Sequence, residues 1–423
     1  IRDRVGLQRI VGGHVVALCR EALFRELRFG ANRCAGRGRH VEEVLDQSMP
    51  HTRAVIHLSH LSHNMQVLEA VAGSTPLWPV IKANAYGHGA SIVASHLVGL
   101  GYRTLCVAHP GEAVTLLESG LRATFIVLTP DLPQDADYYV QHGLEAAVTT
   151  LEMAKALGTA ARRQRRTAAI HIAVDPGMGR VGCYPDEVVS FVNACRSIDG
   201  VIVRGVMSHF PRADEADKVY SLTQLERFNQ LRLKLGGLGG TYHMANSAAL
   251  LALSGSRFNA VRPGIAIYGI NPYQPGIVNA AAGRLQPVME LRSRVIFLKE
   301  VAAGTGLSYG HAYHTAGPAL IATVPVGYGD GLHRSLSNRM HMLVHDVACP
   351  QVGRITMDQS LIDVSALRGR VNVGDEVIII GRQGAAQLTA DELAATLGTI
   401  NYEIVTGIGA RVPRIAIPNQ GAP

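Results

Sequence analysis

The sequence predicts an α/β protein, a (β/α)8 TIM-type barrel followed by a mostly β C-terminal domain. Between Thr52 and Gly269, eight short β-branched runs alternate with helical stretches, which is typical of a barrel of parallel strands. After about Leu285, helices become scarce and short alternating strands are separated by glycines. With 423 residues, of which 47% are hydrophobic and 17% charged, the chain can bury a large core, and this excludes a disordered protein.

The eight runs of the predicted barrel are each four to seven residues long. They are Trp78–Lys82, Thr104–Ala108, Phe125–Leu128, Ala146–Thr149, Ile170–Asp175, Val203–His209, Tyr242–Asn246 and Ala260–Ile265. Amphipathic stretches such as Gly111–Ser119 and Leu222–Leu235 lie between them and predict helices. A doubly wound open sheet is the alternative, because strand order cannot be derived from sequence. The first βα turn lacks a G-x-G-x-x-G pattern, which disfavours a dinucleotide-binding sheet.

The predicted second domain contains mostly strands and one helix, Ala390–Leu397. Its strands are expected at Val288–Leu298, Leu320–Val324, Met342–Val344, Gln359–Val364 and Glu376–Ile380. The segment Ala54–Leu58, which precedes the barrel, is expected to pair with them.

The first fifty residues contain nine arginines and no lysine, and they show few signs of the strand pattern that follows. They lack the features of a secretory signal. We expect residues 1–50 to be a dispensable extension, with the functional chain beginning near Met49. The barrel is then expected over residues 51–284 and the β domain over residues 285–423.

The net charge of +7 is scattered along the chain, so no nucleic-acid partner is expected. The densest basic cluster, Arg162, Arg163, Arg165 and Arg166, is interpreted as the solvated surface of a loop. No apolar run of about 18 residues predicts a membrane-spanning helix. The six cysteines show no paired spacing, so we expect free thiols and a cytoplasmic location.

Polar residues follow five of the predicted barrel strands. They are Lys82, Asp175 with Arg180, His209, Asn246 with Ser247, and Arg262 with Gly264. Because the carboxyl ends of barrel strands meet at one face, where this fold builds its active sites, we expect a pocket there.

Lys82 closes an apolar run, so burial is expected to lower the pKa of its ammonium group. A neutral lysine can form a Schiff base with an aldehyde, although a surface lysine just beyond a strand is the simpler interpretation. Ser247 and the amides of Gly264 and Ile265 resemble the phosphate cradle that barrels build after strands seven and eight. A capping serine and a turn glycine would have the same spacing. A lysine and a phosphate cradle together suggest pyridoxal 5′-phosphate (PLP).

From about Thr52 to Arg414, the chain resembles the alanine racemases. The stretch Val80-Ile-Lys-Ala-Asn-Ala-Tyr-Gly-His-Gly89 is similar to the PLP-attachment motif of that family. The other matching motifs, in the order of the family, are Asp175-Pro-Gly-Met-Gly-Arg180, Ser208-His209-Phe210, His243-Met-Ala-Asn-Ser247, Val261-Arg-Pro-Gly-Ile265, Ser308-Tyr309-Gly310, Gly327-Tyr-Gly-Asp-Gly331, Gly353-Arg-Ile-Thr-Met-Asp-Gln359, Asn401-Tyr-Glu403 and Arg411-Val-Pro-Arg414.

The resemblance implies a PLP-dependent racemase of alanine that works as a homodimer and supplies D-alanine for peptidoglycan. By resemblance, Lys82 is the base for the D-enantiomer. Tyr309 is the base for the L-enantiomer, tuned by His209, which is bonded in turn to Arg262. The resemblance places Arg262 against the pyridine nitrogen of PLP, where a guanidinium cannot readily donate its proton to the ring.

The remaining site residues are also carried over by resemblance. Arg180 and Met357 match substrate-binding positions, whereas Tyr86, Asn246, Ser247, Gly264, Ile265 and Tyr402 match cofactor-binding positions. Tyr328 lies where the family narrows the entrance. Tyr309 and Met357 are expected to reach the site from the partner subunit.

Three positions depart from the pattern of the family. Ala173 stands where a carbamylated lysine often orients the arginine that matches Arg180, Pro176 replaces a frequent threonine, and Thr356 replaces a frequent cysteine. Substrate breadth therefore stays open, and a racemase of serine or of basic amino acids is one alternative. A non-catalytic PLP-binding barrel is another, although such proteins resemble only the barrel half. A PLP decarboxylase is disfavoured, because Arg262 replaces the carboxylate that it needs.

Overall fold

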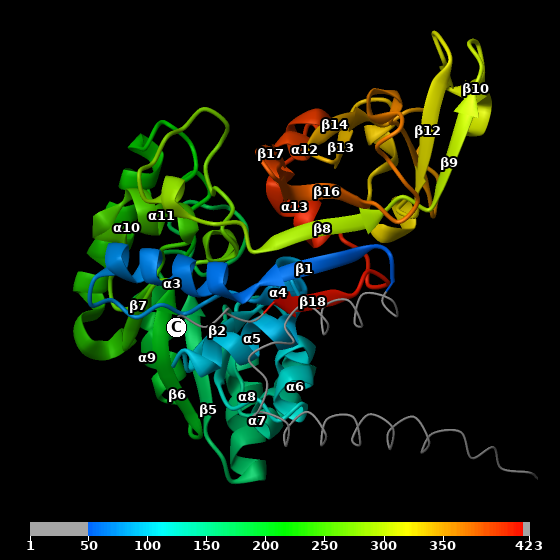
Figure 1. Cartoon of the computed structure of the whole chain (residues 1–423). Coiled ribbons are helices and arrows are strands. Elements are labelled where there is room, and N and C mark those ends of the chain that lie inside the picture. Colours follow the sequence, from blue (N-terminus) through cyan, green and yellow to red (C-terminus); the bar gives the residue numbers. More distant parts are fainter. Residues whose placement is uncertain (1–49, 418–423) are drawn as a thin grey trace, which may run out of the picture. The chain divides into compact units, whose positions relative to one another are not determined.

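The computed structural model describes residues 50–417, so the predicted N-terminal extension lies outside the described residues. A parallel sheet of six strands in the order β2-β3-β4-β5-β6-β7 forms most of the barrel wall. These strands are β2 (Thr104–Val107), β3 (Thr124–Val127), β4 (Glu145–Val148), β5 (Ala168–Ala173), β6 (Val201–Met207) and β7 (Thr241–His243). All six follow the predicted runs within a few residues, and Figure 1 shows β5, β6 and β7 running side by side.

Two extended segments, one around Trp78 and one around Val261, close the barrel between β7 and β2. The Trp78 N–H donates to Val261 O at 2.8 Å and the Cys106 N–H donates to Pro79 O at 2.8 Å, while the Arg262 N–H donates to Ala245 O at 2.9 Å. The barrel prediction is therefore confirmed and the open-sheet alternative is wrong.

Two of the predicted strands are wrong, those at Trp78–Lys82 and Ala260–Ile265. In the described structure these segments form only isolated bridges instead of regular strands. Pro79 and Pro263 have no N–H to donate, so each interrupts its ladder.

Helices α3 to α11 follow or separate the barrel strands, and the two predicted helices are confirmed as α6 and α10. The helices are α3 (Leu58–Ala72), α4 (Lys82–Tyr86), α5 (Ala90–Gly99), α6 (Pro110–Glu118), α7 (Ala136–His142), α8 (Leu151–Gln164), α9 (Val188–Arg196), α10 (Val219–Leu235) and α11 (Ser247–Ala252).

Only half of the arginine cluster lies in the predicted loop, because Arg162 and Arg163 are helical whereas Arg165 and Arg166 follow the helix. Arg162 and Arg163 belong to the last turn of α8, and Arg165 ends the helix with a positive φ of 52°. Cations at a helix C-terminus are stabilised by the helix dipole. Arg163 also pairs with Asp137, and Arg166 donates to Val140 O at 3.0 Å. The cluster thus has local partners.

The second part of the chain is built mainly from strands. A sheet in the order β14-β13-β16-β8-β1-β18, with β17 beside β16, contains β1, which pairs with β8 and β18 as predicted for Ala54–Leu58. Its strands are β1 (Arg53–His57), β8 (Met289–Arg294), β13 (His341–Val344), β14 (Val347–Pro350), β16 (Glu376–Gln383), β17 (Ala386–Leu388) and β18 (Arg414–Ile417). A smaller sheet joins β9 (Phe297–Val301), β12 (Ala319–Val324) and β15 (Ser360–Asp363), and β10 (Gly306–Leu307) pairs with β11 (Tyr313–His314).

Two helices complete this part, α12 (Ala390–Leu397), whose bounds match the prediction, and α13 (Asn401–Thr406). Short 3-10 turns lie at Pro133–Asp135, Gly236–Gly239, Ser254–Ser256, Ile265–Tyr268, Ala282–Arg284, Tyr309–His311, Tyr328–Asp330, Arg334–Leu336 and Ser365–Leu367. Within residues 50–417, no helix is long and apolar enough to cross a membrane.

Candidate active site

Lys82 begins a left-handed turn instead of ending a strand. Ala83, Asn84, Ala85 and Tyr86 all have φ between 51° and 54°. A left-handed conformation costs an L-residue about 1–2 kcal/mol. Four such residues in succession require contacts that compensate for this cost, and backbone strain of this kind is concentrated at functional sites.

Contacts from distant parts of the chain hold this turn. Glu112, at the start of α6, accepts the Ala83 N–H at 2.6 Å. On the other side, Arg414 Nε donates to Gly87 O at 2.8 Å. A Cβ on Gly87 would lie 2.0 Å from Val405 O, so only glycine allows α13 to approach so closely. Strand β18 and helix α13 thus fix the turn that carries Lys82.

The surroundings of Lys82 are cationic. Burial lowers the pKa of its ammonium group, and the nearby Arg180 and Arg262 lower it further, while Glu112 partly opposes them. Burial, with help from Arg262, Arg180 and Lys82, lowers the pKa of His209 to about 3. His209 is therefore a neutral imidazole at neutral pH, and Lys82 loses its proton more readily than a lysine in water.

Arg262 is buried in the barrel and its guanidinium is held by several acceptors. It donates to His243 Nδ1 at 2.5 Å, to His243 O at 2.8 Å and to Ser208 O at 2.5 Å. The prediction that Arg262 bonds to His209 is wrong for the described chain. The hydrogen bonds of the guanidinium go to His243 and Ser208 instead. Burial lowers the pKa of Arg262 to about 10, so the group stays charged at neutral pH. Its Nε–H has no acceptor among the described residues.

Ser247 lies at the start of α11 and faces the turn after the eighth barrel segment. Its hydroxyl oxygen accepts the Gly264 N–H at 2.9 Å and the Ala266 N–H at 3.2 Å. The hydroxyl proton and the Ile265 N–H stay without a protein acceptor in the described part of the chain. A Cβ on Gly264 would lie 2.5 Å from the Tyr86 hydroxyl, so this position has no room for a side chain.

Tyr402 of α13 brings the C-terminal part to the same place. Its ring centroid lies 6.1 Å from that of Tyr86. Burial raises the pKa of both phenols, so both stay protonated donors at neutral pH. Asn246, by contrast, uses its side chain structurally, because its Oδ1 accepts the Ala249 N–H and its Nδ2 donates to Phe210 O.

These residues suit PLP by the chemistry of their donors. Lys82 supplies an amine with a lowered pKa, and the Ser247 hydroxyl and Ile265 N–H are uncharged donors of the kind that bind phosphate. The Arg262 Nε–H has no protein acceptor and can donate to a ring nitrogen.

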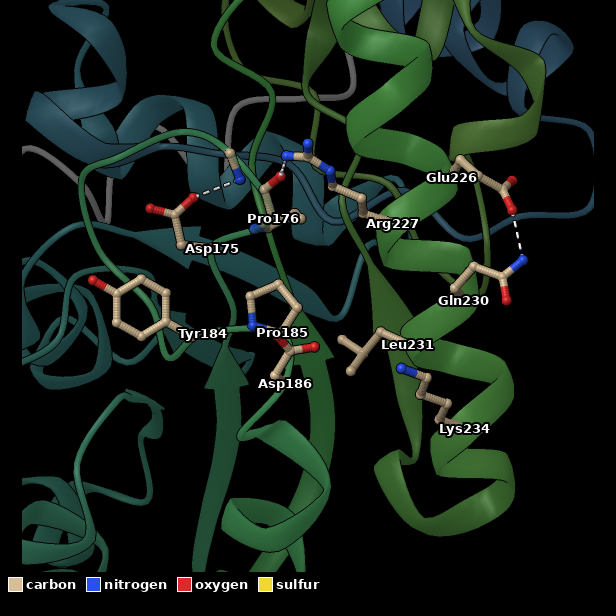
Figure 2. Close-up of a pocket in the computed structure, with 11 residues that line it drawn as sticks. Asp175, Pro176, Tyr184, Pro185, Asp186, Glu226, Arg227, Gln230, Leu231 and Lys234 are labelled. Carbon is tan, nitrogen blue, oxygen red and sulfur yellow. Dashed lines mark hydrogen bonds between the residues drawn. The ribbon is translucent and has the colours of Figure 1, made fainter.

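Arg180 lies in the loop after β5, and the carboxylate of Asp175 organises that loop. It accepts four backbone N–H groups, those of Gly177, Met178, Gly179 and Arg180, at 2.5 to 3.2 Å. Figure 2 shows the neighbouring pocket, in which Arg227 of α10 donates to Pro176 O at 3.1 Å. The backbone of the loop is therefore held from within and from α10.

No lysine supports the Arg180 side chain from β5. Ala173 is buried against Ala147, Met207 and Leu128, which form a small apolar cluster. The Arg180 guanidinium is exposed and has no hydrogen-bond partner in the described chain.

Tyr309 and Met357 are exposed, at 72% and 52%. No hydrogen bond or ring contact joins Tyr309 to the barrel within the described residues. The loops around Met357 are nevertheless ordered, because Arg411 donates to Asp330 at 2.7 Å and to Met357 O at 3.0 Å and pairs with Asp358 at 2.8 Å. One chain therefore brings together Lys82, His209, Arg262, Ser247 and Tyr402, but leaves Tyr309 and Met357 facing outward.

Sequence reasoning did not identify Glu112 or Glu145 as residues near the site. For Glu112 a signal existed, since it stands three residues after His109 and forms a capping box at the N-terminus of α6. Glu145 stands just before the predicted strand Ala146–Thr149, and nothing in the neighbouring sequence distinguishes it from a surface carboxylate.

Comparison with known proteins gives consistent matches. A family model described as alanine racemase, N-terminal domain, matches residues 56–272, and another described as alanine racemase, C-terminal domain, matches residues 288–416. An alanine racemase from Halothermothrix orenii is 42% identical over 370 residues, which are 86% of this chain and 96% of that protein.

Solved structures of alanine racemases also match most of this chain. An alanine racemase from Clostridium difficile has a TM-score of 0.82 at 33% identity, covering 88% of this chain and 97% of that one. The alanine racemase from Bacillus anthracis with bound L-Ala-P has a TM-score of 0.80 at 34% identity, covering 88% and 96%.

Proposed function

The chain belongs to the alanine racemase family, and on that premise we propose that it interconverts L-alanine and D-alanine with PLP as cofactor. The observation that carries the proposal is a lysine with a lowered pKa on a strained turn, beside a buried arginine instead of a carboxylate. PLP, when bound, withdraws electrons from the α-carbon of the amino acid and so acidifies its proton.

Lys82 and Tyr309 are the proposed bases on the two faces of the α-carbon. The Lys82 amine removes the α-proton of D-alanine, and its ammonium form returns a proton to that face. The Tyr309 phenolate removes the α-proton of L-alanine, and the Tyr309 hydroxyl returns a proton there. A phenol is mostly protonated at neutral pH, so it needs a partner that tunes it. His209 can take that part, because its neutral imidazole can accept a hydrogen bond from the phenol.

Arg180 and Met357 bind the substrate in this proposal, Arg180 through the carboxylate of alanine and Met357 through its backbone. Tyr86, Ser247, Gly264, Ile265 and Tyr402 surround the cofactor phosphate, with Asn246 capping the helix that begins at Ser247. Arg262 would hold the pyridine nitrogen as a pure donor, which would keep the ring a weak electron sink and suppress competing reactions.

We propose that the protein works as a homodimer in which Tyr309 and Met357 serve the site of the partner subunit. Their exposure supports this arrangement, because neither residue has a place in the barrel of its own chain. In this proposal the barrel extends over residues 51–284 and the β domain over residues 285–423. The product would supply peptidoglycan in the cytoplasm, and the four described cysteines, all free thiols, suit a reducing compartment.

The direct test follows the optical rotation of L-alanine in the presence of the purified holoprotein. We expect the signal to decay to zero with the wild type and with Lys155→Ala, an exposed lysine of α8, but not with Lys82→Ala. The same assay with L-serine and L-lysine tests the broader racemase. A wild-type protein that binds PLP and leaves all three rotations unchanged would contradict the proposal.

A further inference from the structure

Four side chains form a continuous line of hydrogen bonds through the barrel interior. Glu145 of β4 lies 2.7 Å from His171 Nε2, and His171 Nδ1 lies 2.9 Å from His243 Nε2. His243 Nδ1 in turn accepts from Arg262. His171, His243 and Arg262 are at most 4% exposed, and the Glu145 side chain is 18% exposed.

The two ends of this line determine where every proton lies. A guanidinium can only donate, so His243 Nδ1 must accept and its proton must sit on Nε2. That Nε2–H donates to His171 Nδ1, which leaves the His171 proton on Nε2, directed at Glu145. An ionised carboxylate can only accept, which completes the line. Both imidazoles are therefore neutral, in the same tautomer, and all three hydrogen bonds point from Arg262 to Glu145.

The barrel wall is shaped to allow this line. His171 and His243 lie on β5 and β7, with β6 between them, and their rings meet across β6 at Gly205. A Cβ on Gly205 would lie 2.6 Å from His171 Nδ1, where it would separate the two rings. Trp78 packs edge-on against both imidazoles, with centroids 6.0 Å from His171 and 4.9 Å from His243.

Glu145 is the counter-charge at the far end of the line. Arg262 also lies near Cys106 of β2, but burial raises the pKa of that thiol to about 12, so it is neutral. The remaining contacts of the guanidinium are the carbonyls of Ser208 and His243. On the site side, Lys82 is a basic group and offers Arg262 no negative charge.

We propose that Glu145, His171 and His243 are positioning residues that lock the Arg262 guanidinium in one orientation and supply its charge balance from the opposite side of the barrel. The inference deepens the proposed function, because it concerns the group that faces the cofactor ring. Through the line, the orientation of Arg262 is fixed before any cofactor binds.

The first test needs neither cofactor nor activity. In apoprotein labelled with 15N-histidine, the imidazole shifts of His171 and His243 are assigned from spectra of His171→Gln and His243→Asn. At neutral pH we expect two neutral imidazoles, both protonated at Nε2. A proton on Nδ1 of either ring would overturn the proposal even if the protein proves to have no racemase activity.

The second test compares conservative and disruptive variants in the holoprotein. His171→Leu removes both hydrogen bonds, whereas His171→Gln offers one acceptor and one donor in their place. We expect His171→Leu to lower kcat roughly tenfold or more, by analogy with outer-shell partners of metal ligands, and to shift the absorbance spectrum of bound PLP. His171→Gln should restore most of the wild-type kcat and most of the wild-type absorbance spectrum. Equal kcat values and spectra in the wild type and His171→Leu would refute the positioning role.

Discussion

Lys82 and Tyr309, the two proposed bases, occupy opposite environments. Lys82 lies on a turn held by α6, α13 and β18, and burial, together with two nearby arginines, lowers the pKa of its amine. Tyr309 is 72% exposed on a short 3-10 turn, and no residue of the described chain contacts its hydroxyl. The half of the site around Lys82 is therefore built by the barrel together with α13 and β18 of the same chain, whereas Tyr309 of the β domain faces outward. The difference is consistent with the proposed homodimer, in which one chain contains two half-sites, each completed by a second copy.

The largest effect is expected from Tyr309→Phe, which removes the proposed base that faces outward. If Tyr309 serves one face of the α-carbon, we expect racemisation to fall by about 10²–10⁴-fold, the usual contribution of a general acid or base. In D2O, the α-proton of D-alanine should still exchange through Lys82, while that of L-alanine should not, as measured by proton NMR. Tyr184→Phe is the matched control, because Tyr184 is equally exposed at 73%. Equal exchange rates for the two enantiomers would contradict the role of Tyr309.

A mixed dimer tests whether the two half-sites belong to different chains. Lys82→Ala and Tyr309→Phe are each expected to be inactive, but a heterodimer of the two would contain one site with both residues intact. Random reassociation of equal amounts should restore about a quarter of wild-type activity, since half of the dimers are mixed and each has one working site. A mixture that forms heterodimers and stays inactive would show that both bases act within one chain.

Gly264→Ala tests how tightly the barrel half is packed. The added Cβ would lie 2.5 Å from the Tyr86 hydroxyl, so the phosphate cradle must shift. We expect the affinity for PLP to fall about tenfold, within the usual range for overpacking, as measured by fluorescence titration of the apoprotein. Tyr86→Phe removes the clashing atom, so the double variant should bind more tightly than Gly264→Ala alone. Wild-type affinity in Gly264→Ala would show that the cradle is loose.

The smallest expected effect concerns the charge around Lys82. Because Arg180 helps to lower the pKa of Lys82, Arg180→Gln should raise that pKa, and the amine should then lose its proton at higher pH. The rate at which the apoprotein captures PLP should therefore begin to rise at higher pH than in the wild type. Arg204→Gln, an exposed arginine of β6, should leave the profile unchanged. Identical profiles for Arg180→Gln and the wild type would show that Arg180 does not influence the pKa of Lys82.

Much of the fold could be predicted because it depends on local patterns. Helix α12 has the predicted bounds, and the six strands β2–β7 lie within a few residues of the predicted β-branched runs. The left-handed turn after Lys82 could not be predicted, since its residues are alanine, asparagine and tyrosine, and the contacts that hold it come from Val405 and Arg414. The partner of Arg262 was also predicted wrongly. Sequence order favours neither His209 nor His243, and the choice depends on how the rings fill the barrel.

The dependence of the Lys82 turn on Arg414 has a consequence for the timing of synthesis. Arg414 donates to the carbonyls of Gly87, Ile408, Gly409 and Val412, so it ties the turn to the last described strand. A ribosome-bound chain that ends before this residue has the lysine but lacks the contacts that hold the strained backbone. We therefore expect nascent chains to remain unable to capture cofactor until Arg414 and β18 have emerged, which links cofactor capture to the progress of translation.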